Sequence, residues 1–250
     1  MCPAACGVPA TLVAHDQRGL RLHQRQSAVN PTHPMQTPFF TDLVLRTDEA
    51  RRTFENHPVV LDAAAHGLTV ERYRRLLQEL YHVVWHFNPL SAAAASRMPD
   101  AFRNVRYFLY EHMQEEAGHE QWVVNDLEAI GMPAAAAVAA PASIDTLALV
   151  GYNYWAAERR HPCSVLGMLY ALEVIASVYG GTFAAAMREA LLLEGDAGVS
   201  FIASHATLDQ AHMAELRQVL NTVTDAAAQD AVAESAAVNF HHITRIFAAV

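Results

Sequence analysis

Helical periodicity runs through the sequence from about residue 36 onward, and it constrains the fold more than any other feature. Apolar residues recur at spacings of three and four, and no stretch shows the alternation typical of a half-buried strand. Thr69, Asp100 and Ser143 precede helical segments as candidate N-caps, and Gly131 follows one. The sequence therefore predicts an all-α protein, a bundle of about seven to eight helices. The clearest helices are expected over residues 58–65, 72–97, 100–130, 143–159, 164–187, 200–222 and 225–248.

Three features within this pattern carry further expectations. Pro89 lies inside a long predicted helix and is expected to interrupt it, because proline removes a backbone donor. Residues 134–140 are rich in alanine and are expected to form a connection. Gly180 and Gly181 lie inside the apolar segment 164–187, which nevertheless reads as one long helix.

The first 35 residues differ from the rest of the chain. They contain Pro3, Pro9, Pro31 and Pro34 and show no sustained periodicity. We therefore interpret residues 1–35 as a flexible N-terminal leader and residues 36–250 as a single domain, which is long enough to bury a substantial core.

Charge and composition exclude several classes of partner. The net charge of −9 and the lack of a basic stripe argue against nucleic acid. No run of 18 uninterrupted apolar residues occurs, so no membrane span is expected. The N-terminus lacks a basic region followed by an apolar one, and three cysteines cannot form a disulfide framework. A cytoplasmic protein is therefore expected.

The most specific motif is His205-Ala-Thr-Leu-Asp209-Gln-Ala-His212. At about 100° per residue, these three metal-competent side chains share one narrow face of a helix. The neighbouring positions are mostly apolar, so these polar side chains need bonding partners where little water is present. A metal ion is a suitable partner for all three. The alternative is a polar stripe whose members are solvated or bond to one another.

A second motif places Glu116 and His119 three residues apart. This Glu-x-x-His spacing is used by helical bundles that hold two iron ions between facing helices. Glu115 and His112 fall near the same helical face, so either could take the place of Glu116. Taken alone the motif is weak, because it arises by chance in many acidic helices.

A single carboxylate, Glu173, lies in the otherwise apolar segment 164–187. Burying an unpaired charge is costly, so Glu173 is expected to bind a cation or a strong partner. A further Glu-x-x-His pair, Glu79 and His82, lies among aromatic residues. The residues expected to line a substrate pocket are Tyr81, His82, Trp85, His86 and Tyr170, although His82 and His86 could instead be core histidines with internal partners.

Taken in order, these motifs resemble those of the haem-oxygenase-like di-iron oxidases, over about residues 57–223. That family is related in fold to TenA thiaminases and to the pyrroloquinoline-quinone synthesis oxidase. Many of its members place the first glutamate farther upstream of the histidine, whereas this chain has His112 seven residues before His119. The resemblance implies one iron held by Glu116, Glu173 and His205, with Glu173 as a candidate bridge, and a second iron held by His119, Asp209 and His212.

The resemblance also implies an activity. It predicts Fe(II), two ions, with O2 as co-substrate. The reaction would be N-oxygenation, desaturation or oxidative cleavage of an amino-acid-derived or fatty-acid substrate, as in natural product biosynthesis. An external electron donor and a homodimer are further expectations.

Four alternatives stay open at this point. The first two are a metal-free TenA-like hydrolase, for which Cys163 is the candidate nucleophile within the predicted domain, and an oxidase like that of pyrroloquinoline-quinone synthesis. The others are a haem protein with one axial histidine and a helical protein without catalytic activity.

Overall fold

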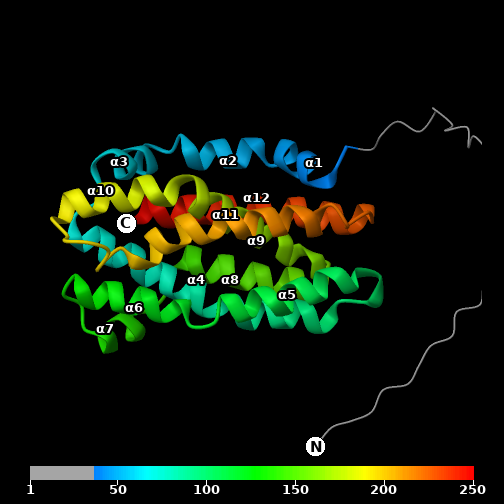
Figure 1. Cartoon of the computed structure of the whole chain (residues 1–250), viewed down its shortest axis with the longest axis horizontal. Coiled ribbons are helices and arrows are strands. Elements are labelled where there is room, and N and C mark those ends of the chain that lie inside the picture. Colours follow the sequence, from blue (N-terminus) through cyan, green and yellow to red (C-terminus); the bar gives the residue numbers. More distant parts are fainter. Residues whose placement is uncertain (1–36) are drawn as a thin grey trace, which may run out of the picture. The chain divides into compact units, whose positions relative to one another are not determined.

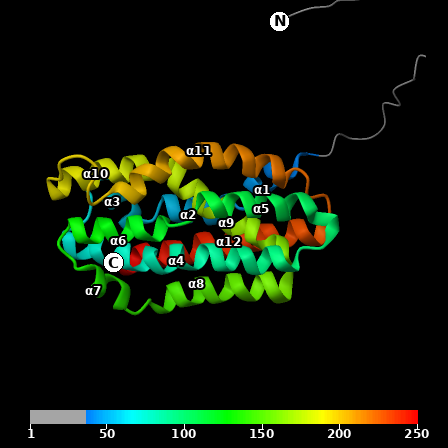
Figure 2. The ribbon, with the colours of Figure 1, turned by 60° about the horizontal axis from the view of Figure 1, so that its bottom comes forward.

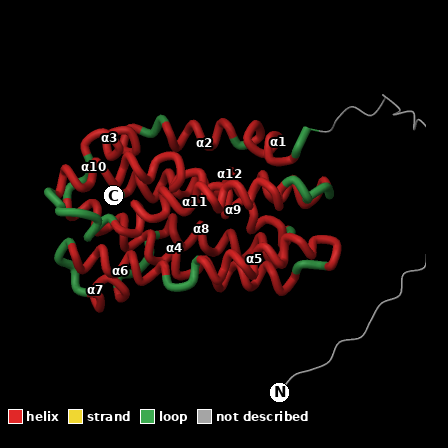
Figure 3. Tube along the Cα trace, in the orientation of Figure 1, coloured by secondary structure: helices red, strands yellow, loops and turns green. Residues whose placement is uncertain are grey.

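The computed structural model describes residues 37–250, and this part of the chain consists of helices joined by short loops (Figures 1 and 3). The predicted leader lies outside the described residues. The α-helices are α1 (Phe39–Arg46), α2 (Asp48–Glu55), α3 (Pro58–His66), α4 (Val70–Arg97), α5 (Arg103–Glu115), α6 (His119–Ala129), α7 (Ala134–Ala139), α8 (Ile144–Trp155), α9 (Val165–Ile175), α10 (Gly181–Leu191), α11 (Ser200–Leu220) and α12 (Ala226–Ala249). The 3-10 turns are η1 (Asp100–Phe102) and η3 (Pro162–Ser164), and the π-helical turns are η2 (Ala156–Arg160) and η4 (Ala176–Gly180).

The predicted all-α fold class is confirmed, because residues 37–250 contain no strand. In Figure 1, α1–α3 form one edge of the bundle, α9–α12 run beside them, and α4–α8 complete the opposite side. Figure 2 shows α11 and α8 on different sides, with α4 and α12 between them. The core lies around α9, whose side chains are mostly buried, and around the buried half of α12.

Local sequence explains where several helices begin. The hydroxyl of Thr69 accepts a bond from the Arg72 amide at the start of α4, and Ser143 caps α8 in the same way. Asp225 accepts from the Ala228 amide at the start of α12. These side chains satisfy amides that a helix leaves without partners in its first turn.

Some predicted boundaries are wrong. The helix expected over 100–130 divides into η1, α5 and α6, because Gly118 adopts a left-handed conformation (φ 94°) between the last two. Helix α4 continues through Pro89, and residues 134–139 form α7 rather than a connection. The segment α9–η4–α10 is continuously helical across the two glycines, with the wider π-helical turn at η4.

Residues 162–191 form one helical stretch that is long and apolar enough, by length and composition, to cross a membrane. In the most apolar window of this stretch, 67% of the residues are buried inside the bundle. This burial is typical of the central helix of a helical core.

The crossing of α9 and α12 depends on Gly167. A Cβ atom there would collide with the backbone oxygen of Val232 and lie 2.7 Å from the amide nitrogen of Ala236. We expect Gly167→Ala to lower the free energy of unfolding by about 3 kcal/mol, because overpacking forces backbones apart. Thermal or urea denaturation measures the effect. Gly151→Ala in α8 is the control, since its Cβ meets open space; equal stabilities of the two variants would contradict this prediction.

Candidate metal centre

Three stretches of the bundle bring the predicted ligands together. The end of α5 carries His112, and Glu116 follows its last turn. The left-handed Gly118 then turns the chain so that α6 begins with His119 facing Glu116. Glu173 comes from the buried helix α9, and His205, Asp209 and His212 come from one face of α11, as the sequence predicted. All seven of these side chains are buried.

One group of potential ligands consists of Glu116, His119 and His205. Oε2 of Glu116 lies 2.7 Å from Nδ1 of His119 and 3.6 Å from Nε2 of His205. The two imidazole nitrogens are 3.1 Å apart. One ligand atom from each residue lies within 4.8 Å of the others, which is close enough for them to share one ion.

A second group contains His112, Glu116, Glu173 and His212. Oε1 of Glu173 lies 3.4 Å from Nε2 of His112 and 3.4 Å from Nδ1 of His212. The other oxygen of Glu116, Oε1, is 3.6 Å from Nδ1 of His212. The two oxygens of Glu116 therefore face different groups, which is the arrangement expected of a carboxylate shared by two ions.

This grouping differs from the division that the resemblance implied. His119 pairs with His205, and Glu173 with His212, while Glu116 rather than Glu173 faces both groups. His112, which the sequence offered only as an alternate, belongs to the second group. Asp209 lies outside both groups, with Oδ1 3.4 Å from Nδ1 of His212. Its role as a ligand stays a prediction.

Glu115, the other alternate, differs from Glu116 in its surroundings. Its side chain is 51% exposed, and Oε2 lies 3.5 Å from Nε2 of His212. Water can hydrogen-bond to the exposed carboxylate of Glu115, whereas the buried carboxylate of Glu116 finds its partners within the cluster. The structure thus favours Glu116 over Glu115 as the central carboxylate.

Several buried polar atoms of the cluster have no hydrogen-bond partner among residues 37–250. These atoms are both ring nitrogens of His112, Oε2 of Glu173, Oδ1 of Asp209 and Nδ1 of His212. Such atoms are rare in folded proteins, because each loses the bonds that it makes to water. Their concentration at one place fits a metal centre, since imidazole and carboxylate ligands without thiolate suit iron.

The titration properties of the cluster agree with this interpretation. Burial lowers the pKa of His112 to about 4, so its imidazole is neutral and keeps a lone pair for a metal. Burial raises the pKa of Glu173 to about 7, and the carboxylates of Asp209 and Glu173 raise that of His212 to about 10. Glu173 and His212 therefore keep protons that a bound cation would displace.

Glu116 behaves differently from Glu173. Burial disfavours its charged form, but the bonds with His119 and His205 outweigh burial and hold its pKa well below the usual range. Glu116 is therefore ionised before any metal arrives.

An apolar cavity of about 160 Å³ adjoins the cluster. Four of its lining residues belong to the candidate ligand set, namely Glu116, Glu173, His205 and Asp209. The rest of the wall is almost entirely apolar and comes from α2, α3, α4, α9, η4, α10, α11 and α12. It includes Phe54, Val60, Ala63, Ala64, Leu80, Val83, Val84, Phe87, Leu172, Tyr179, Phe183, Phe201 and Phe247.

None of the residues predicted to line a substrate pocket lines this cavity, although His86 lines a second, smaller pocket. On α4 the cavity is lined by Leu80, Val83, Val84 and Phe87, which recur at helical spacing. Tyr81, His82, Trp85 and His86 occupy the remaining faces of the same two turns, and Tyr170 packs between Phe40 and Phe240. The pocket prediction chose polar and aromatic residues of α4, whereas an entirely apolar face of the helix lines the cavity.

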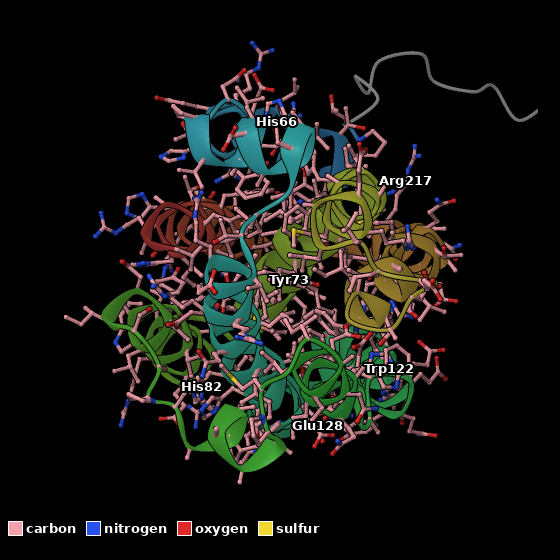
Figure 4. The ribbon with its side chains drawn as sticks, turned by 90° about the vertical axis from the view of Figure 1, so that its left-hand side faces the viewer. His66, Tyr73, His82, Trp122, Glu128 and Arg217 are labelled. Carbon is pink, nitrogen blue, oxygen red and sulfur yellow. The ribbon has the colours of Figure 1, made fainter. Side chains whose placement is uncertain are left out.

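His82 and His86 have partners away from the cluster. His82 Nε2 lies 2.8 Å from the Ala140 carbonyl oxygen, and the Tyr154 hydroxyl contacts His86 Nδ1 at 3.2 Å. Glu79 accepts a bond from the Ser143 amide, so this Glu-x-x-His pair holds the start of α8. In Figure 4, His82 lies well to the side of Trp122, whose ring stacks on His119.

Fold and site together define a helical-bundle protein with a buried imidazole–carboxylate centre beside an apolar cavity. The profile of the iron-containing redox enzymes matches residues 74–241. The chain belongs to this family. No curated protein matches the sequence.

Solved structures with the same fold come from distant proteins. A domain of unknown function with a haem oxygenase-like fold from Shewanella denitrificans is 22% identical, with a TM-score of 0.74 over 84% of this chain and 90% of that one. A TenA homologue from Pseudomonas syringae is 14% identical, with a TM-score of 0.73 over 87% and 96%. Haem oxygenase-1 from Synechocystis in complex with haem is 17% identical, with a TM-score of 0.68 over 85% and 92%. These likenesses confirm the predicted haem-oxygenase-like fold.

Proposed function

We propose that this protein is a non-haem di-iron oxidase or oxygenase that uses O2 to oxidise a fatty-acid-like substrate. The observation that carries the proposal is the apolar cavity whose wall includes Glu116, Glu173, His205 and Asp209. A hydrocarbon chain in this cavity would place its reacting end beside the metal ligands. The family assignment to iron-containing redox enzymes supports the choice of metal.

The lining favours a fatty acid over an amino-acid-derived substrate. A substrate with an amino group would need a buried acceptor or counter-charge away from the metal ligands. The only other polar side chain that lines the described cavity is Tyr179, whose hydroxyl bonds to Glu55. Methylene groups gain about 0.8 kcal/mol each when they leave water, so this wall selects for chain length.

Different residues of the cluster would hold the two ions. One ion would be held by Glu116, His119 and His205, and the other by His112, Glu116, Glu173 and His212, with Asp209 beside His212. When bound, the iron pair would supply the electrons and open positions that O2 activation requires. Phe87, Leu172 and Phe201 line the cavity that adjoins the cluster, and their apolar side chains would disfavour water there.

Two alternatives lose support from the geometry. Cys163, the candidate nucleophile of a TenA-like hydrolase, is fully buried against Met98, and burial raises its pKa to about 12. A thiol in that state is a poor nucleophile. A single axial histidine for haem would leave the remaining unbonded atoms of the cluster unexplained.

Metal loading is expected to stabilise the protein. An ion that binds only the folded chain contributes about 2.7 kcal/mol at a concentration of 100 times its Kd. For a domain of this size, that corresponds to a rise in Tm of roughly 5–10 °C. Anaerobic titration with Fe(II), followed by calorimetry, measures both the stoichiometry and the shift, and a chelator should reverse it.

The same titration tests the proposed function. We expect uptake near two ions per chain and oxygen consumption that depends on added saturated fatty acids. Amino acids serve as the comparison substrates. Absence of iron uptake would refute the proposal, and stimulation by amino acids alone would refute the assigned substrate class.

A further inference from the structure

The N-terminus of α11 lacks a cap from its own segment. The N-cap residue is Val199, whose side chain has no acceptor. Asp126 of α6 supplies one instead, although it lies 73 positions earlier in the sequence. Its Oδ1 accepts from the amides of Gly198 (3.1 Å) and Ser200 (2.9 Å) and from the Ser200 hydroxyl (2.7 Å). Its Oδ2 accepts from the Phe201 amide at 2.8 Å.

This carboxylate is a buried anion whose bonds all go to one short segment. Asp126 is about 1% exposed, so it depends on these four donors rather than on water. The positive end of the α11 dipole favours its charge. On the other side of the segment, the Tyr73 hydroxyl donates to the Gly198 carbonyl oxygen at 2.9 Å. The first turn of α11 is therefore fixed from both α4 and α6.

The fixed turn connects directly to a predicted ligand. Phe201, whose amide Asp126 binds, accepts a bond through its carbonyl oxygen from Nδ1 of His205 at 2.8 Å. This bond orients the imidazole ring so that Nε2 points toward His119 and Glu116. Second partners of this kind fix the tautomer and direction of metal-binding histidines.

Asp126 also shares its helix with His119. The two residues are seven positions apart, which is about two turns of α6, so they lie on nearly the same face. Asp126 therefore holds α6 and α11 together at one point, and His119 and His205 meet about two turns away along α6 and about one turn away along α11. Movement of α6 against α11 at Asp126 would therefore change the distance between the imidazoles of His119 and His205.

We propose that Asp126 is a positioning residue of the metal centre, which sets His205 against His119 and Glu116 by capping α11 from α6. The inference rests on the proposed function for the presence of a metal, whereas the hydrogen bonds of Asp126 do not depend on that function. Asp126 itself touches no predicted ligand side chain through these bonds. Its effect passes through the Phe201 backbone.

The test compares Asp126→Asn with Asp225→Ala in the full-length protein. Asparagine keeps one acceptor oxygen but turns an amino group toward backbone amides. Asp225→Ala removes the cap of α12, which carries none of the predicted ligands. We expect Asp126→Asn to weaken anaerobic Fe(II) and Co(II) binding by about 10- to 100-fold, as loss of such outer partners does, and Asp225→Ala to leave it unchanged.

A second readout needs no metal. In the metal-free protein labelled with 15N-histidine, the Nδ1 proton of His205 should exchange slowly, and at least tenfold faster in Asp126→Asn. Unchanged metal affinity together with unchanged exchange would overturn the proposal. If the wild type binds no metal, the proposed function fails, and the exchange rate still decides the role of Asp126. If Asp126→Asn does not fold, Ser200→Ala replaces it in both measurements, because it removes only the hydroxyl donor to Asp126.

Discussion

Replacing Glu116 with glutamine is expected to abolish tight iron binding and, with it, oxygen consumption. The two oxygens of Glu116 face the two groups of potential ligands, so its loss affects both ions. Loss of an outer hydrogen-bond partner already lowers metal affinity by about 10- to 100-fold, and loss of a shared ligand should lower it further. Anaerobic titration of Fe(II), with the iron content of the purified variant, measures the effect.

Glu115→Gln is the matched control for this variant. It makes the same chemical change one residue earlier, at a side chain that is half exposed. We expect near-normal iron content and activity from Glu115→Gln, and circular dichroism establishes that both variants are folded. The reverse result, with loss of iron in Glu115→Gln alone, would assign the first carboxylate to Glu115.

The second large effect concerns the substrate rather than the metal. Ala63 of α3 lines the cavity, and a phenylalanine there would fill part of the space available to a chain. If the ring displaces about three methylene groups, at about 0.8 kcal/mol each, affinity should fall roughly 50-fold for long chains. Binding of a series of saturated fatty acids, measured by calorimetry, should show the shorter chains least affected.

Ala65→Phe separates this effect from a general disturbance of α3. Ala65 is exposed on the same helix, so its substitution leaves the cavity unchanged. Iron content should be normal in both variants, since α3 carries no predicted ligand. Equal weakening of short and long chains by Ala63→Phe would show that the cavity does not hold the substrate chain.

Much of the site was predictable because it depends on spacing along single helices. His205, Asp209 and His212 share a face of α11, and the apolar neighbours of Glu173 indicated its burial. Which ligands on different helices come together could not be predicted from spacing along a single helix. Whether Glu173 lies nearer to His205 or to His212 depends on how α9 and α11 are packed, and the sequence does not encode this register locally.

Two other features of the site lay outside what the sequence predicted, for physical reasons. Pocket residues on α4 were chosen for their polar and aromatic chemistry, whereas the apolar residues Leu80, Val83, Val84 and Phe87 carry the helical period that marks a buried wall. Asp126 was missed because its role is a cap for a helix far away in the sequence. A missing acceptor at Val199, just before α11, was the available signal.

The π-helical turn η4 makes the chain after Glu173 sensitive to the deletion of residues. Glu173 before the turn, Tyr179 within it and Phe183 after it all line the cavity. A π turn accommodates one residue more than a regular helix. Deleting a single residue there would rotate α10 by about 100° relative to α9. Deletions in η4 are therefore expected to be tolerated less well than substitutions, because they turn one wall of the cavity outward.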